Sequence, residues 1–246
     1  MSTIEKKHIG ELVAEDYRTA SVFKKHKIDF CCNGGRSVED ACTTKGINLN
    51  EITDELEKAM QNDASDTPDF QSWPLDLLAD YIEKKHHRYT EKRLGEILPF
   101  LEKLCKVHGT RHPELLEIKQ LFSESAGELT QHMKKEELVL FPFVRKMVQA
   151  QQEGTTIDNP HFDSVENPIA MMMEEHDTEG GRFREIAQLT NDYTPPADAC
   201  NTYRVTFAML RRIQEDLHKH IHLENNILFP QSIELESRLP KPVLLT

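Results

Sequence analysis

Two short segments of the chain carry the same arrangement of a histidine and a glutamate. Residues 132–142 read HMKKEELVLFP, and residues 220–230 read HIHLENNILFP, 88 positions later. In both segments the histidine precedes the glutamate by four positions, so the two side chains lie on one face of a helix. Each segment therefore aims an imidazole and a carboxylate at one point. Two such helices facing each other would bring these groups together as a metal site.

The repeat extends to one histidine upstream of each segment. His86 precedes His132 by 46 positions, and His176 precedes His220 by 44. Two adjacent histidines compete for the first of these positions. We predict His86, because it continues an apolar stripe with steps of three and four, whereas His87 falls among charged residues on the opposite face. The residues of the stripe around His86 are Leu75, Leu78, Ile82, Tyr89, Arg93 and Ile97.

The predicted inward-facing set contains four imidazoles and two carboxylates, which exceeds the four ligands of one tetrahedral zinc ion. It suits two metal ions that share the carboxylates, with two histidines on each ion. Histidine and carboxylate ligands without thiolate favour iron, with manganese second. Six structural core residues are the alternative, but two buried carboxylates without a cation would cost several kcal/mol. The predicted ligands are His86, His132, Glu136, His176, His220 and Glu224.

Four long helical patterns must position these side chains. They are predicted over residues 74–108, 112–149, 167–191 and 198–236. Pro99 is expected to kink the first helix. Short to moderate connections favour neighbouring antiparallel helices. The sequence therefore predicts an all-α fold, with an up-down-up-down four-helix bundle over residues 73–246.

A smaller helical domain is predicted to precede the bundle over residues 1–62, with a polar, acidic linker at 63–72. Its three short helices break at DFCCNGGRS, after which Ser37 is a suitable N-cap. Cys31 and Cys32 are adjacent just before this helix start, where a thiol can have a depressed pKa. They are candidates for a redox or transfer role, as acceptors of metal or NO. Two inert buried thiols are an equally good interpretation.

The composition excludes several classes of protein. The chain has 246 residues, of which 38% are hydrophobic and 29% charged, with a net charge of -12. Scattered Lys and Arg form no basic stripe, which argues against binding to nucleic acid or a membrane surface. We expect a cytoplasmic protein, because no apolar run could span a bilayer and the start lacks a secretory signal. The odd number of cysteines argues against a disulfide framework.

These motifs resemble those of the repair-of-iron-centres (RIC) family, of the YtfE/ScdA type, over nearly the whole chain. DFCCNGG is similar to the short ScdA-type domain, and the two LFP segments, with MEEHD around His176, are similar to a hemerythrin-like bundle. The resemblance implies a centre of two non-haem iron ions, with oxo and carboxylate bridges. It assigns the six predicted ligands to that centre, with Glu136 and Glu224 as the bridging residues.

The resemblance also implies a role in repairing iron–sulfur clusters damaged by oxidative or nitrosative stress, by supplying iron or handling nitric oxide (NO). Expected partners are damaged iron–sulfur proteins and the gases NO and O2. Two other classes stay open: an O2- or NO-binding sensor, and a redox enzyme such as a di-iron NO reductase or a peroxidase. Also open are enzymatic activity, homodimer formation, manganese or zinc substitution, and the roles of Glu128 and Glu175 beside the predicted ligands.

Overall fold

The computed structural model describes residues 4–61, 68–158 and 160–240. Every regular element in these ranges is a helix, and the single extended pairing is an isolated bridge between His8 and Ser37. The all-α prediction is therefore confirmed. Part of the predicted linker, residues 63–67, lies outside the described residues.

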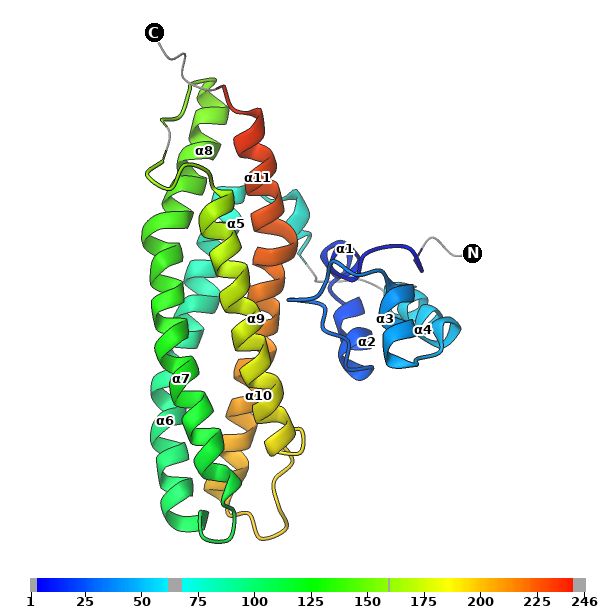
Figure 1. Cartoon of the computed structure of the whole chain (residues 1–246), viewed down its shortest axis with the longest axis vertical. Coiled ribbons are helices and arrows are strands. Elements are labelled where there is room, and N and C mark those ends of the chain that lie inside the picture. The colour runs from blue at the N-terminus through cyan, green and yellow to red at the C-terminus, as the bar shows by residue number, and fades with distance from the viewer. Residues whose placement is uncertain (1–3, 62–67, 159, 241–246) are drawn as a thin grey trace.

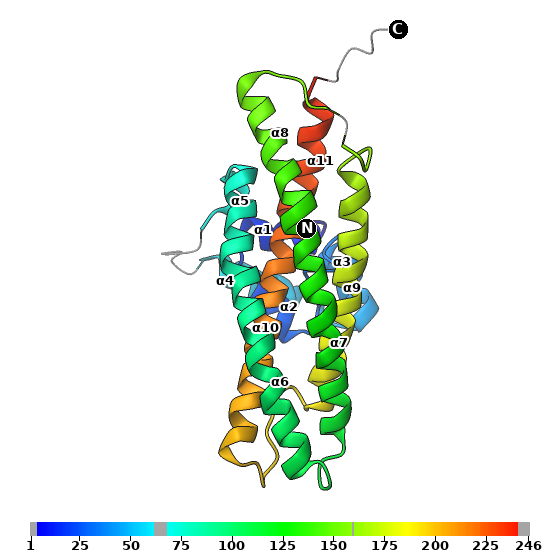
Figure 2. The ribbon, with the colours of Figure 1, turned by 90° about the vertical axis from the view of Figure 1, so that its left-hand side faces the viewer.

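Four long helical rods form an elongated bundle (Figures 1 and 2). The first rod comprises α5 (Leu75–Tyr81), η2 (Ile82–His87) and α6 (Arg88–His108). The second comprises α7 (Glu114–Lys135), η3 (Glu136–Leu140) and α8 (Phe141–Glu153). The third is α9 (Glu166–Leu189), and the fourth comprises α10 (Asn201–Leu223), η4 (Glu224–Leu228) and α11 (Phe229–Arg238). Successive rods run in opposite directions, as the up-down-up-down prediction requires. α6 continues through Pro99 without a break in the helix.

π-helical turns interrupt three of the rods, and two of these turns begin at the predicted glutamate ligands. Glu136 starts η3 and Glu224 starts η4, and the helix after each turn has a proline at its second residue. A proline has no N–H, and its ring crowds the carbonyl four residues earlier. A π turn accommodates one extra residue, and such turns concentrate at functional sites. The repeated Leu-Phe-Pro sequence thus accompanies the same local distortion in both rods.

Two apolar clusters occupy different levels of the bundle. One joins the N-terminal helices to α6, α7, the end of α9 and α10. The other joins α5, α8, α11 and the start of α9. In the first three rods the predicted ligands fall between the residues of these two clusters, and in the fourth rod His220 and Glu224 flank the boundary at Ile221 and Leu223. A polar site is therefore enclosed by apolar packing from both ends.

Residues 4–61 of the N-terminal unit contain four helices, where three were predicted: α1 (Ile9–Glu15), α2 (Thr19–Lys25), α3 (Val38–Lys45) and α4 (Leu49–Gln61). α1 and α2 were predicted as one helical face. Ser37 caps α3 as predicted, because its Oγ accepts a hydrogen bond of 3.0 Å from the backbone N–H of Asp40. The unit lies beside the bundle, and the loop between α2 and α3 reaches α9 and η4 (Figure 1).

Candidate metal centre

Six buried side chains converge between the two apolar clusters. Their donor atoms form two overlapping sets, each with all its atoms within 4.8 Å of one another. The sets are His87, Glu136, His220 and Glu224, and His132, Glu136, His176 and Glu224. Both glutamates belong to both sets. The arrangement is therefore one double site with shared carboxylates.

Each glutamate presents one oxygen to each set. Oε2 of Glu136 lies 3.3 Å from Nε2 of His87, and Oε1 of Glu136 lies 3.4 Å from Nε2 of His132. Glu224 faces the other two histidines in the same way. Its Oε1 lies 2.9 Å from Nε2 of His220, and its Oε2 lies 3.2 Å from Nε2 of His176. A carboxylate with one oxygen facing each of two ligand sets has the orientation of a bridge between two ions.

The imidazole nitrogens are also spaced as ligands of common ions. Nε2 of His87 lies 3.2 Å from Nε2 of His220, and Nε2 of His132 lies 3.0 Å from Nε2 of His176. Two nitrogens bound about 2.1 Å from one ion, at roughly a right angle, lie about 3 Å apart. The histidines thus form two pairs, one for each ion.

Charge and burial favour a bound cation at this position. Both oxygens of Glu136 and Oε2 of Glu224 are buried and accept no hydrogen bond from the described residues. Burial lowers the pKa of His87, but Glu136 and Glu224 outweigh it and raise this pKa to about 10. Burial also raises the pKa of Glu136, as does Glu224, yet His132 and His87 lower it to about 2. Without metal, imidazolium charge would have to balance the two carboxylates, so the donor set fits bound cations.

Three of the four histidines are oriented through their other ring nitrogen. Nδ1 of His132 lies 2.8 Å from Glu175, and Nδ1 of His87 lies 3.1 Å from Glu137. Nδ1 of His176 lies 2.8 Å from Oδ1 of Asn225. Such partners fix the ring and leave Nε2 free to bind a metal.

Of the two glutamates whose roles were open, Glu175 is an orienting partner of His132. Its hydrogen bond with His132 holds the pKa of Glu175 at about 2, although burial opposes this shift. Glu128 has no such role, because its carboxylate pairs with Arg182 at 2.6 and 2.8 Å on the exposed side of the bundle.

Comparison with known proteins agrees with this geometry. Residues 78–232 match the Hemerythrin HHE cation binding domain, and residues 5–60 match ScdA_N, a domain of unknown function. Iron-sulfur cluster repair protein YtfE of Yersinia pestis (strain Pestoides F) is 32% identical over 228 residues, which cover 93% of this chain and 97% of that protein. The protein of the same name from Yersinia pseudotuberculosis serotype O:3 (strain YPIII) gives the same values. The chain belongs to the YtfE family of iron–sulfur cluster repair proteins. The resemblance inferred from its motifs is confirmed.

In this YtfE-family chain, the structure places His87 rather than His86 in the cluster. His86 is also buried, but its Nδ1 lies 3.1 Å from Asp216 and its ring stacks on His220 at a centroid distance of 5.8 Å. The structure therefore leaves His86, the predicted ligand, outside the clustered donors. Both histidines lie in the π turn η2. The extra residue of a π turn shifts the helical phase, so a stripe extended at 3.6 residues per turn points to the wrong neighbour.

The other five predicted ligands, His132, Glu136, His176, His220 and Glu224, all lie in the cluster. Metal binding by these residues stays a prediction.

His218 and His222 lie on α10 where the N-terminal unit packs against it. The N-terminal unit covers this side of α10, and His222 is 1% exposed. Its ring lies 5.7 Å from that of Tyr17 and 6.0 Å from that of Phe30. Phe30 also lies 6.1 Å from the ring of His218. The interface between the N-terminal unit and the bundle therefore buries this side of α10. The periodicity of α10 alone could not indicate that another part of the chain packs there.

Cys31 and Cys32 lie next to the candidate metal centre, in the loop between α2 and α3. Their sulfurs are 3.8 Å apart, and the Cys32 thiol donates to the carbonyl oxygen of His176 at 3.4 Å. A hydrogen bond with Cys32, burial and the charge of Asp29 raise the pKa of Cys31 well above its ordinary value. The expected depression of the pKa is therefore wrong for Cys31.

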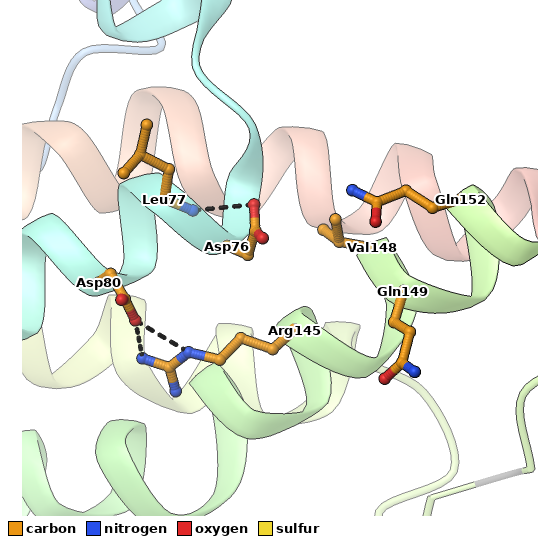
Figure 3. Close-up of a pocket in the computed structure, with 7 residues that line it drawn as sticks. All are labelled: Asp76, Leu77, Asp80, Arg145, Val148, Gln149 and Gln152. Atoms are coloured by element: carbon orange, nitrogen blue, oxygen red, sulfur yellow. Dashed lines mark hydrogen bonds and ion pairs between the residues drawn. The ribbon is translucent and has the colours of Figure 1, made fainter.

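Two surface pockets lie away from the candidate metal centre. One, of about 370 Å³, lies between α5 and α8 (Figure 3). Among the described residues that line it, Arg145 is the only cation, and it is paired with Asp80 at 2.7 Å and Glu83 at 2.8 Å. The other, of about 580 Å³, is lined by η3, α8 and the loop after α8. Neither pocket is lined by a residue of the metal cluster. Among the described helices, none combines the length and apolar character needed to cross a membrane.

Proposed function

We propose that this protein binds two iron ions through the six clustered side chains and uses them in the repair of damaged iron–sulfur clusters. One ion would be held by His87 and His220, and the other by His132 and His176. Glu136 and Glu224 would bridge them. The observation that carries this proposal is that each carboxylate presents one oxygen to each histidine pair, within 2.9 to 3.4 Å of the nitrogens.

A bound iron pair would supply one-electron chemistry and open positions for a small ligand such as NO or O2. The chain itself supplies a rigid, water-poor enclosure. The two apolar clusters cover the site from both ends, and Glu137, Glu175 and Asn225 hold the imidazole rings in orientation. Two glutamates offset two of the positive charges, so the pair binds with less repulsion between the ions.

Iron is also the material that a damaged cluster lacks. In this proposal, the protein releases iron as a substrate to a damaged iron–sulfur protein in the cytoplasm. Support comes from the family membership and from the N-terminal loop, which touches the His176 carbonyl through Cys32. Three earlier expectations stay predictions: the domain boundaries at 62 and 73, homodimer formation and the gas partners.

The test is a reconstitution in which an enzyme with an NO-damaged [4Fe–4S] cluster is incubated anaerobically with the iron-loaded protein. We expect recovery of the enzyme's activity with the wild-type protein. Matched controls are the Glu136→Ala/Glu224→Ala protein and an equal amount of free ferrous iron with a chelator that competes for released iron. Recovery no greater than in these controls would contradict iron supply.

The same preparation separates the alternatives. Absence of repair combined with reversible NO or O2 binding would indicate a gas-binding sensor. Sustained NO consumption with an added electron donor would indicate an NO reductase. Iron analysis and anomalous scattering at the iron edge test the two-iron stoichiometry directly.

A further inference from the structure

The geometry points to a second metal site, formed by Asp29, Cys31 and Cys32, that binds a thiolate-accepting divalent cation such as Zn²⁺ or Fe²⁺. The three side chains place one donor atom each within 4.8 Å of one another. The carbonyl oxygen of His176 lies at the edge of this group, 3.4 Å from the Cys32 sulfur. This site is separate from the double site in the bundle, with which it shares no side chain.

The distances within the group match those of a tetrahedral site. The two sulfurs are 3.8 Å apart. Two sulfurs held about 2.3 Å from one ion at the tetrahedral angle also lie about 3.8 Å apart. Both sulfur–oxygen distances, from Cys31 to Asp29 and from Cys32 to the His176 carbonyl, are 3.4 Å. A sulfur and an oxygen on one tetrahedral ion lie about 3.6 Å apart. Little movement would be needed to bind a cation.

The charges balance when a divalent ion replaces two thiol protons. Each thiol now donates a hydrogen bond to an oxygen, Cys31 to Asp29 and Cys32 to the His176 carbonyl. On binding, two S–H bonds break, two sulfur–metal bonds form and two protons leave to the solvent. Two thiolates and Asp29 carry three negative charges, which the ion and the guanidinium of Arg184, 2.8 Å from Asp29, neutralise. No oxidant or reductant is needed.

The local backbone keeps this site close to α9. A β-carbon at Gly180 would lie 3.1 Å from the Cys32 sulfur, tighter than ordinary van der Waals contact. Glycine at this position therefore lets Cys32 approach the helix that carries His176. Cys32 is partly exposed whereas Cys31 is buried, so an ion would enter from the Cys32 side. The mixture of sulfur and oxygen ligands favours Zn²⁺ or Fe²⁺ over Mg²⁺ or Ca²⁺.

Binding at this site stands on its own geometry, whereas a role in iron transfer rests on the proposed function. In that role, the thiolates would receive a ferrous ion next to the ligand helix before it passes to a client protein.

The experiment is a titration of the metal-free, reduced full-length chain with Co²⁺ under anaerobic conditions. We expect a thiolate-to-cobalt charge-transfer band in the near ultraviolet, which histidine and carboxylate ligands do not produce. Cys31→Ser and Cys32→Ser should each abolish the two-thiolate spectrum, whereas Cys200→Ser, at an exposed cysteine outside the group, should retain it. Glu136→Gln/Glu224→Gln should also retain the band, which separates this site from the double site.

Two further variants guard against a folding defect, with circular dichroism as the check. Asp29→Asn keeps an oxygen that accepts hydrogen bonds but loses the charge, and Arg184→Gln removes the outer cation. We expect each to weaken Co²⁺ binding about tenfold or more. No band in the wild-type protein while both thiols react as free thiols would overturn the proposal. A full band in the Cys31→Ser/Cys32→Ser double variant would overturn it equally.

Discussion

Substitution of His87 and His86 one at a time tests the assignment of the centre. The two residues are adjacent and both buried, yet only His87 has a nitrogen in the cluster, 3.2 Å from that of His220 and 3.3 Å from Glu136. His87→Ala removes one of the two nitrogens of one predicted ion. His86→Ala removes a hydrogen bond with Asp216 and a stacked ring, but no donor of the cluster.

The expected magnitude follows from these contacts. Loss of an outer partner of a metal ligand typically weakens binding about 10- to 100-fold. Loss of one of only two nitrogens on an ion should cost at least about 100-fold, or about 2.8 kcal/mol at 1.4 kcal/mol per factor of ten. His87→Ala should therefore retain about half of the iron after equilibrium dialysis. His86→Ala should keep both ions and lose only folding stability, by about 2 kcal/mol or more, because a buried ring is replaced by a cavity.

The assay is metal analysis of dialysed protein together with a competition titration against a chelator of known affinity. Thermal melts of the metal-free variants separate a folding defect from a binding defect. The reasoning would be refuted if His86→Ala lost an ion while His87→Ala kept two. That outcome would mean that His86, as the apolar stripe predicts, and not His87 faces the metal site.

Three other substitutions or treatments test the packing and the electrostatics. Gly34→Ala should destabilise the N-terminal unit by about 1–3 kcal/mol, because a β-carbon at this position would lie 2.7 Å from the Phe30 carbonyl oxygen. The measurement is a denaturant titration. Gly35→Ala is the control, because a β-carbon there would have no atom within 4 Å. Glu179→Gln should raise the melting temperature at pH 7 but not at pH 4. Burial raises the pKa of Glu179, so the protonated carboxyl contributes stability below the ordinary pKa of 4.5, and this contribution is lost as the pH rises above 4.5. Removal of iron by a chelator should lower the free energy of unfolding by about 2.7 kcal/mol, relative to protein with free iron at 100 times its Kd.

Each of these has a contrary outcome. Equal destabilisation by the two glycine variants would argue against the close approach at Gly34. A stabilising effect of Glu179→Gln that persists at pH 4 would assign it to packing rather than charge. If the chelator does not change the melting temperature, the folded chain binds no metal.

The local pattern of the chain determined most of the site. Spacings of four residues put His132 with Glu136 and His220 with Glu224, and repetition of the pattern predicted that two carboxylates would be shared. Apolar periodicity located the four rods, because amphipathic helices bury one face whatever their partners are. Glu175, a neighbour of His176 in sequence, was open as a partner and lies against His132.

Tertiary structure decided the features that depend on helical phase or on distant segments. The π turn η2 adds one residue to the first rod, which turns His87 inward and leaves His86 against Asp216. A covering domain buries His222, and Asn225 joins the Cys31 carbonyl to His176 across that interface. Periodicity reports which residues of one helix share a face. It carries no information on a change of pitch within the helix, or on which other part of the chain packs against that face.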